Sequence, residues 1–191
     1  MKYVAILLFD GAEELDFAGP LEVFGITGRL KPNSIGAFTV GASDKEVQCV
    51  NGLTVRPQHS FQSCPNFDIL VVPGGQGSRR EMENADILRF VKRAASSCEL
   101  VASVCTGALI LASAGLLDGK HATTHWAALD ELKRFPKVIG DHQRFIHEGK
   151  VVTSGGISAG IDMALYLVGL FFGADVTAEV AHRMEYRKGF C

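Results

Sequence analysis

The stretch ELVASVCTGALILASAG, residues 99–115, joins an apolar strand to an apolar helix with almost no loop between them. We expect a strand over 99–104 and a helix over 106–114, which Gly115 ends. Cys105 therefore falls at the turn, with a small residue two positions away on either side. This is the steric pattern of a nucleophile elbow, with cysteine in place of the usual serine.

Outward from this elbow, the chain alternates strands with helices. The apolar runs at residues 3–9 and 68–75 are typical of strands covered on both faces. Helices are expected from about Gly19, with Pro20 at an early helical position, and over 80–97. This alternation predicts a three-layer α/β/α sandwich on a mostly parallel sheet.

Shorter elements complete the pattern. The sequence predicts extended pieces at 37–42, 47–50, 53–56 and 121–124, a helix over 126–135, a β-pair around 144–153 and two closing helices. Ligands of such folds bind where loops leave the carboxyl ends of the strands. The candidate loops are therefore 10–19, 73–77 and 103–107.

Composition limits the classes of protein to consider. The 191 residues are 47% hydrophobic and 21% charged, so we expect one folded domain over 1–191. A net charge of −2 gives no general attraction to nucleic acid or to an anionic membrane. The apolar stretch 157–172 contains Asp162 and is too short to span a bilayer. With no secretory signal pattern, a cytoplasmic protein is expected.

Cys105 is the cysteine with a chemical setting. A thiol at a helix N-terminus feels unpaired amides and the positive end of the helix dipole, so we expect it to be more acidic than a free cysteine. The alternative is a small buried hydrophobic residue. The other cysteines lack such a position: Cys49, Cys64, Cys98 and Cys191.

An acidic loop precedes the first expected helix. Glu13, Glu14 and Asp16 follow the first strand, and so lie at the same sheet edge as Cys105. A desolvated carboxylic acid there would keep its proton and could deliver it to a substrate. The alternative is that Asp16 caps the helix.

Two glycine pairs are candidates for close backbone approach. The amides of Gly74 and Gly75, with that of Thr106, could form an anion-stabilising pocket, or the pair could simply form a turn. Gly155 and Gly156 could border the same pocket or only permit the turn before the next helix.

Histidine spacing gives no metal site. His121 and His125 are four residues apart, but the segment resembles the end of a strand and lacks the HExxH glutamate. His125 could instead serve as a base or a polar wall near Cys105. No metal site is therefore expected.

Beyond spacing, the chain resembles the ThiJ/PfpI superfamily, whose fold is flavodoxin-like and class I glutamine amidotransferase-like. The resemblance lies in FDGAEELDFAGPLEVF (9–24), DILVVPGG (68–75), SVCTGALILASAGLL (103–117), ATTHW (122–126) and VVTSGGISAGIDMAL (151–165). Within the superfamily it is most similar to the isonitrile hydratase branch, in which SVCTG and LDxxGP occur together.

The resemblance implies an activity. Cys105 matches the nucleophile, Asp16 the neighbouring acid and Thr106 the threonine after the nucleophile. These residues would convert an isonitrile into an N-substituted formamide through a thioimidate, without a cofactor, in a homodimer that binds a small-molecule substrate.

Other activities remain open. The same thiol could serve a glyoxalase or deglycase acting on reactive aldehydes, or a non-catalytic redox-sensing or ligand-binding module. A peptidase is disfavoured because Thr106, and not histidine, follows the cysteine. DNA binding by a regulator of this superfamily is disfavoured because no helix-turn-helix domain follows Cys191.

Overall fold

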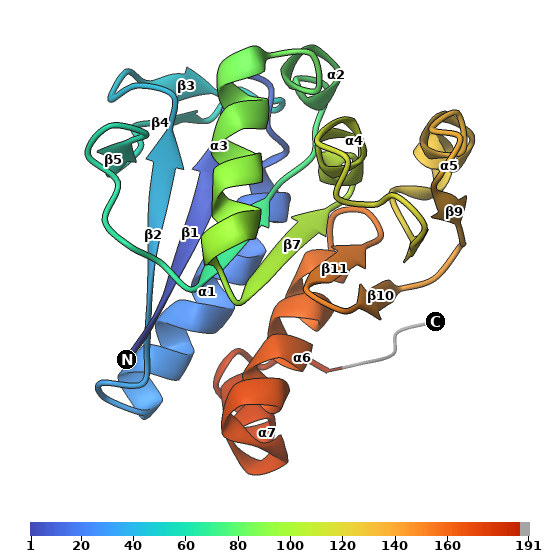
Figure 1. The fold of residues 1–191 in the computed structure, drawn as a ribbon. Coiled ribbons are helices and arrows are strands. Elements are labelled where there is room, and N and C mark those ends of the chain that lie inside the picture. Colours follow the sequence, from blue (N-terminus) through green and yellow to red (C-terminus); the bar gives the residue numbers. More distant parts are fainter. Residues whose placement is uncertain (188–191) are drawn as a thin grey trace.

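A central sheet organises the computed structural model, which describes residues 1–187. Its strands are β1 (Lys2–Leu8), β2 (Ile35–Gly41), β5 (His59–Ser60), β6 (Ile69–Val72), β7 (Leu100–Val104), β10 (Phe145–Glu148) and β11 (Val151–Ser154). Within the described residues the order is β10-β11-β7-β6-β1-β2-β5 (Figure 1). Every neighbouring pair is parallel except the β10–β11 hairpin, so the expected mostly parallel sheet is confirmed.

Helices cover both faces of this sheet. On one face, α1 (Glu14–Leu30), α6 (Ala159–Phe172) and α7 (Ala174–Arg183) contact one another. On the other lie α2 (Ser78–Glu81), α3 (Ala85–Ser97) and α4 (Gly107–Ser113), with α5 (Leu129–Leu132) beside α4 (Figure 1). The predicted three-layer sandwich is therefore confirmed.

Among the described residues, two small two-stranded sheets lie outside the central sheet. The extended pieces expected at 47–50 and 53–56 form an antiparallel hairpin of β3 (Val47–Gln48) and β4 (Thr54–Val55). A second small parallel pair joins β8 (His121–Ala122) to β9 (Ile139–Gly140).

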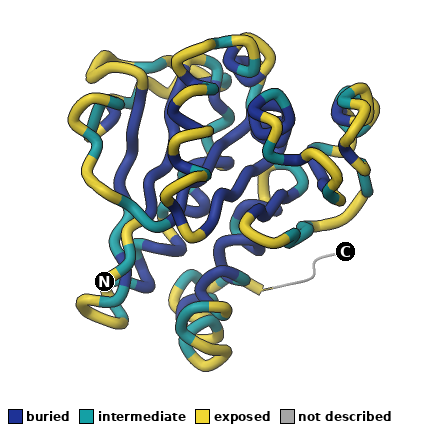
Figure 2. Tube along the Cα trace, viewed as in Figure 1, coloured by how far each residue is buried: buried dark blue, intermediate teal, exposed yellow. Residues whose placement is uncertain are grey.

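Burial follows the strand pattern. Residues 4–8 of β1 and all of β6 and β7 are buried, because helices cover both sides of these central strands. Figure 2 shows the central strands as continuous dark blue and the outer turns of α3 in yellow. None of the helices in residues 1–187 is both long and apolar enough to cross a bilayer.

The first helix begins earlier than the sequence predicts. We expected it from about Gly19, with Asp16 just before it, but α1 starts at Glu14 and contains Pro20. Pro20 lacks only its own amide proton, and the acidic side chains of Glu14 and Asp16 lie in the first turn, where the helix dipole favours negative charge. Asp16 is therefore a helical residue.

Two other expected helices are broken. The helix expected over 80–97 is two helices, because the Asn84 side chain accepts the Asp86 amide at 3.0 Å and caps a new start for α3. The helix expected over 126–135 is a 3₁₀ turn, Trp126–Ala128, followed by the single turn α5.

Close packing sets α6 against the sheet. A Cβ added to Gly160 would lie 2.9 Å from Cγ1 of Val104 and 3.1 Å from its Cγ2, and Val104 is the last residue of β7 before Cys105. Val104 is buried and β-branched, so it has little freedom to move aside. The absence of a side chain at Gly160 therefore fixes the distance between α6 and the elbow.

We predict that Gly160→Ala destabilises the fold by about 1–3 kcal/mol through overpacking. Gly25→Ala is the matched control, because its added Cβ would have only the end of the Arg29 side chain, at 3.6 Å, nearby. That helical substitution should be neutral or stabilise by about 0.5–1 kcal/mol. Urea unfolding of both variants measures the difference, and equal effects would contradict the packing argument.

Candidate active site

Four loops meet at the carboxyl edge of the sheet. The strands β1, β6, β7 and β11 are parallel, so the segments that follow them emerge on the same side. Three of these segments were expected from the sequence. The fourth, residues 155–158 after β11, was anticipated only as a possible border.

Cys105 occupies the strained turn between β7 and α4. Its φ is +55°, a left-handed conformation that is uncommon for a residue other than glycine. The Cys105 amide is shared between the carbonyls of Ser154 and Gly155, each at 3.1 Å, and the Thr124 hydroxyl donates to the Cys105 carbonyl at 2.8 Å. These bonds hold the strained backbone, as at a nucleophile elbow.

Asp16 lies inside this site and does not cap its own helix. The side chain is fully buried, and Oδ2 accepts the Gly74 amide at 2.9 Å while Oδ1 accepts the Ile157 amide at 3.2 Å. Ile157 also has a φ of +55°, which is strained for a β-branched residue. The capping alternative for Asp16 is therefore wrong, and the carboxyl joins the loops after β6 and β11.

Burial governs the protonation of Asp16. Desolvation is the main reason that the pKa of this carboxyl rises to about 7, and the nearby charge of Glu13 adds to the rise. The Gly74 amide, the Cys105 side chain and the Ile157 amide oppose it through hydrogen bonds to the carboxylate. Asp16 therefore exchanges its proton near neutral pH.

The thiol of Cys105 is less acidic than the sequence predicts. Desolvation, followed by the charge of Asp16, raises its pKa to about 12, although hydrogen bonds from the Thr106 amide and hydroxyl lower it. Helix α4 has only seven residues, and its N-terminal amides do not outweigh burial. The expectation of an acidic thiol is therefore corrected: the resting residue is a neutral thiol.

The Gly74–Gly75 turn approaches the elbow closely. A Cβ added to Gly74 would lie 2.4 Å from the Thr106 nitrogen and 2.9 Å from Cβ of Cys105, so only glycine fits. The Gly74 amide binds Asp16, and the Gly75 amide donates to Oγ1 of Thr106 at 3.0 Å. Two of the three amides expected to form an anion pocket, those of Gly74 and Gly75, are therefore used within the protein.

Ser78 completes the surroundings of Thr106. It is fully buried, and its hydroxyl lies 2.8 Å from Oγ1 of Thr106 and 2.7 Å from the Gly75 carbonyl. Ser78 and the Ile157 amide were not predicted as site groups. Ser78 belongs to no quoted motif, and Ile157 lies in the stretch 151–165 without a chemical side chain to mark it. Both reach the site through contacts between loops distant in sequence.

His125 and the second glycine pair border the elbow. Nδ1 of His125 accepts the Ala127 amide at 3.2 Å, and a Cβ on Gly156 would lie 2.1 Å from the imidazole Cδ2. Within residues 1–187, no hydrogen bond joins His125 to Cys105 or Asp16. His125 thus forms a wall against Gly156, while the Gly155 carbonyl supports the Cys105 amide.

The remaining cysteines lie elsewhere. Cys49, Cys64 and Cys98 are free, and burial raises the pKa of each thiol. Cys191 lies outside the described residues. In the part of the chain that the structure describes, no group of three His, Cys, Asp or Glu side chains is placed to hold a metal ion.

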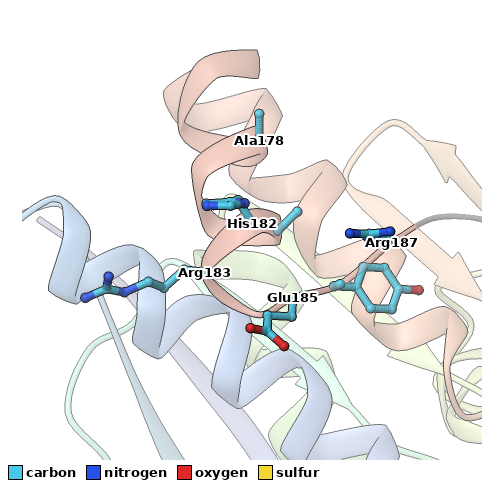
Figure 3. A pocket seen from close by; sticks show the side chains of 7 residues that line it. Ala178, His182, Arg183, Glu185 and Arg187 are labelled. Atoms are coloured by element: carbon cyan, nitrogen blue, oxygen red, sulfur yellow. The ribbon is translucent and has the colours of Figure 1, made fainter.

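Access to the sulfur is narrow. Cys105 exposes 6% of its surface, and Asp16 none. A larger cavity of about 920 Å³ lies at the end of α7, where His182, Arg183 and Glu185 line it (Figure 3). Neither Cys105 nor Asp16 lines that cavity.

Known proteins share this sequence and fold. The chain is 37% identical to an isonitrile hydratase of Pseudomonas putida over 183 residues. This alignment covers 96% of this chain and 78% of the hydratase. It is 27% identical to the HTH-type transcriptional regulator GbdR of Pseudomonas aeruginosa, over 97% of this chain but only 51% of the regulator.

A solved structure agrees with the fold. A THiJ/PfpI family protein from Pseudomonas syringae superposes with a TM-score of 0.90 at 29% identity, covering 98% of this chain and 76% of that one. The model of the DJ-1/PfpI family matches residues 2–170. The superfamily expected from the sequence motifs is confirmed, and the chain belongs to the DJ-1/PfpI family.

Proposed function

We propose that this chain is a single-domain, cytoplasmic hydratase that converts an isonitrile into the N-substituted formamide. The observation that carries the proposal is the buried Asp16 carboxyl beside Cys105, with a pKa of about 7. The similarity to the Pseudomonas putida isonitrile hydratase supports the choice of substrate.

The substrate has an unusual requirement. The terminal carbon of R–N≡C must receive both a nucleophile and a proton. A neutral thiol beside a carboxylate holds one proton between two groups, and this is the form expected above the Asp16 pKa. The pair therefore carries both reactants to one atom.

In the first step, the Asp16 carboxylate takes the Cys105 proton as sulfur attacks the terminal carbon. Asp16 then delivers that proton to the same carbon, which gives the thioimidate R–N=CH–S–Cys105. Sulfur gains a bond to carbon, the carbon gains hydrogen, and Asp16 returns to the carboxylate.

Water completes the reaction. The water oxygen adds to the thioimidate carbon while the Asp16 carboxylate accepts a proton from that water. Asp16 then passes this proton to the thioimidate nitrogen. The adduct then breaks its C–S bond, the hydroxyl proton returns through Asp16 to sulfur, and R–NH–CHO leaves. The balance is one water consumed and one formamide released, with the thiol restored.

The narrow opening favours this substrate over an aldehyde. The C≡N end of an isonitrile is linear and one atom wide, whereas a 2-oxoaldehyde presents a branched carbonyl to sulfur. A thiol that is 6% exposed admits the linear group more easily. A neutral, buried thiol is also slow to oxidise, which disfavours a redox sensor.

We predict that Cys105→Ala reduces hydration of an alkyl isonitrile to the uncatalysed rate, and that Asp16→Asn lowers kcat by at least about 100-fold. The Asn variant loses the group that moves the proton. Gas chromatography of the formamide measures the rate, and thermal melting checks the fold.

Cys98→Ala is the matched control, because Cys98 is also a buried thiol but lies outside the site. It should keep wild-type turnover. Methylglyoxal is assayed in parallel: consumption of the aldehyde without isonitrile turnover would replace the proposal with a glyoxalase-like activity. Full isonitrile turnover in Cys105→Ala would refute the mechanism.

The pH dependence follows from Asp16. Its pKa is raised to about 7, so the required carboxylate forms above that pH, and kcat/KM should fall tenfold per unit below it. No alkaline decline is expected near pH 9, because the Cys105 thiol keeps its proton to about 12. A profile of kcat/KM from pH 5 to 9 tests this.

Glu13→Gln provides the control for this assignment. The Glu13 charge raises the Asp16 pKa, so its removal should move the acidic limb to lower pH. Glu22→Gln, at an exposed position on α1, should not move it. A limb that stays in place in Glu13→Gln would assign the titration to another group.

We also propose a homodimer with the site near its interface. Three exposed apolar residues adjoin site residues along the chain or through the backbone: Leu15 precedes Asp16, Ile157 donates its amide to Asp16, and Trp126 follows His125. Trp126 is 71% exposed, which is unusual for so large an apolar side chain. A second copy of the chain would cover this patch.

Light scattering should therefore give about twice the 20.5 kDa mass of one chain. Leu15→Asp should shift the protein toward monomer, because a charge would be buried in the interface. Leu170→Asp, at an exposed position on α6 away from the patch, should remain dimeric. A monomeric wild type would reject the interface.

A further inference from the structure

The Thr106 hydroxyl belongs to a small, partly buried ring of oxygens. Its Oγ1 accepts the Gly75 amide at 3.0 Å, lies 2.8 Å from the Ser78 hydroxyl, and lies 3.1 Å from the Gly75 carbonyl. Ser78 is itself 2.7 Å from that carbonyl. Three oxygens therefore touch one another, and two hydroxyl protons serve them.

Counting protons gives two arrangements of this ring. The Gly75 carbonyl can only accept, and the Gly75 amide can only donate. In the first arrangement, Ser78 donates to Thr106 and Thr106 donates to the carbonyl. In the second, Ser78 donates to the carbonyl, and the proton of Thr106 is free to turn elsewhere.

The second arrangement brings that proton to sulfur. Thr106 follows Cys105 directly, and a Cβ built on Gly74 would lie 2.6 Å from Oγ1 of Thr106 and 2.9 Å from Cβ of Cys105, so the hydroxyl and the cysteine side chain border the same point. A Thr106 hydroxyl that turns toward the thiolate lowers the pKa of the thiol. Without the Ser78 hydroxyl, turning the Thr106 hydroxyl toward sulfur would deprive the half-buried Gly75 carbonyl of its hydroxyl donor. With Ser78, the carbonyl keeps a donor at 2.7 Å. The Ser78 amide also donates to this carbonyl, at the longer distance of 3.2 Å, so the Ser78 hydroxyl supplies the shorter of the two bonds, and the exchange is worth roughly one hydrogen bond.

We infer that Ser78 is a positioning residue that acts through Thr106: its hydroxyl replaces that of Thr106 on the Gly75 carbonyl, and so frees the Thr106 proton to stabilise developing charge on Cys105. The kinetic consequence rests on the proposed function, whereas the effect on sulfur does not. Ser78 itself touches neither sulfur nor substrate.

The Ser78 hydroxyl is not needed to hold the turn that leads into α2. The Ser78 amide, and not its hydroxyl, closes the turn onto the Gly75 carbonyl at 3.2 Å. Ser78→Ala keeps that bond and adds no atoms, so the start of α2 should persist. Among residues 1–187, the Ser78 hydroxyl hydrogen-bonds only the Gly75 carbonyl and the Thr106 hydroxyl.

A double-mutant cycle measures the coupling. We expect Ser78→Ala to lower kcat for isonitrile hydration about tenfold with little change in KM, the loss of roughly one hydrogen bond. Thr106→Val should cost more, and adding Ser78→Ala to it should cost almost nothing further. Thr27→Val is the matched control, because it removes a buried hydroxyl that donates to the Val23 carbonyl at 2.7 Å in α1. It should keep full activity.

A second measurement is independent of isonitrile turnover. The rate of Cys105 alkylation by iodoacetamide at pH 8, read from peptide masses, follows the small fraction of thiolate. It should fall severalfold in both Ser78→Ala and Thr106→Val. Alkylation of the buried Cys98, measured in the same samples, reports any general opening of the fold and should stay unchanged.

The outcomes separate the two proposals. If the wild type fails to hydrate isonitriles while Ser78→Ala still slows Cys105 alkylation, the proposed function fails and the role of Ser78 stands. If Ser78→Ala slows alkylation or turnover by the same factor in the Thr106→Val background, Ser78 does not act through Thr106. An unchanged alkylation rate in Ser78→Ala also overturns the inference.

Discussion

The site depends on one buried carboxyl group. Asp16 accepts an amide from the loop after β6 and another from the loop after β11, and so links α1 to two other segments. The same Asp16 charge raises the pKa of Cys105, and burial raises the pKa of Asp16 itself. The buried Asp16 carboxyl therefore both holds the loops of the site together and helps to set the protonation of the Cys105 thiol. Two residues of the site have left-handed backbones: Ile157 is held by the Asp16 carboxyl itself, and Cys105 is held by the carbonyls of Ser154 and Gly155.

The sequence is informative where local pattern decides structure. Buried strands are visible in the sequence as apolar runs, and the turn at Cys105 requires the small residues around it. The strands and the turn were therefore predictable. The boundaries of the helices were less predictable than the strands. Pro20 suggested a late start for α1, but a proline inside a packed helix is tolerated when tertiary contacts hold the rest. Asn84 similarly caps the start of α3 inside a stretch that the sequence predicts as one helix.

The finer chemistry of the site could not be predicted, because it depends on burial. The helix N-terminus predicted an acidic thiol, but desolvation and the Asp16 charge reverse the direction. The amides of Gly74 and Gly75 looked available in sequence, yet Asp16 and Thr106 occupy them in space. Ser78 carries no motif, and only the fold brings it to Thr106.

A high thiol pKa suits the proposed reaction better than the thiolate that the sequence suggested. A preformed thiolate has already given its proton to solvent, and isonitrile carbon needs that proton as well as the sulfur. A carboxylate that titrates near 7 beside a thiol that titrates near 12 retains one proton over several pH units. The pair then transfers sulfur and proton together, and the stabilisation of charge on sulfur is needed only while the proton is on Asp16. A hydroxyl such as that of Thr106, which can turn toward sulfur at that moment, meets this need without making the resting thiol acidic.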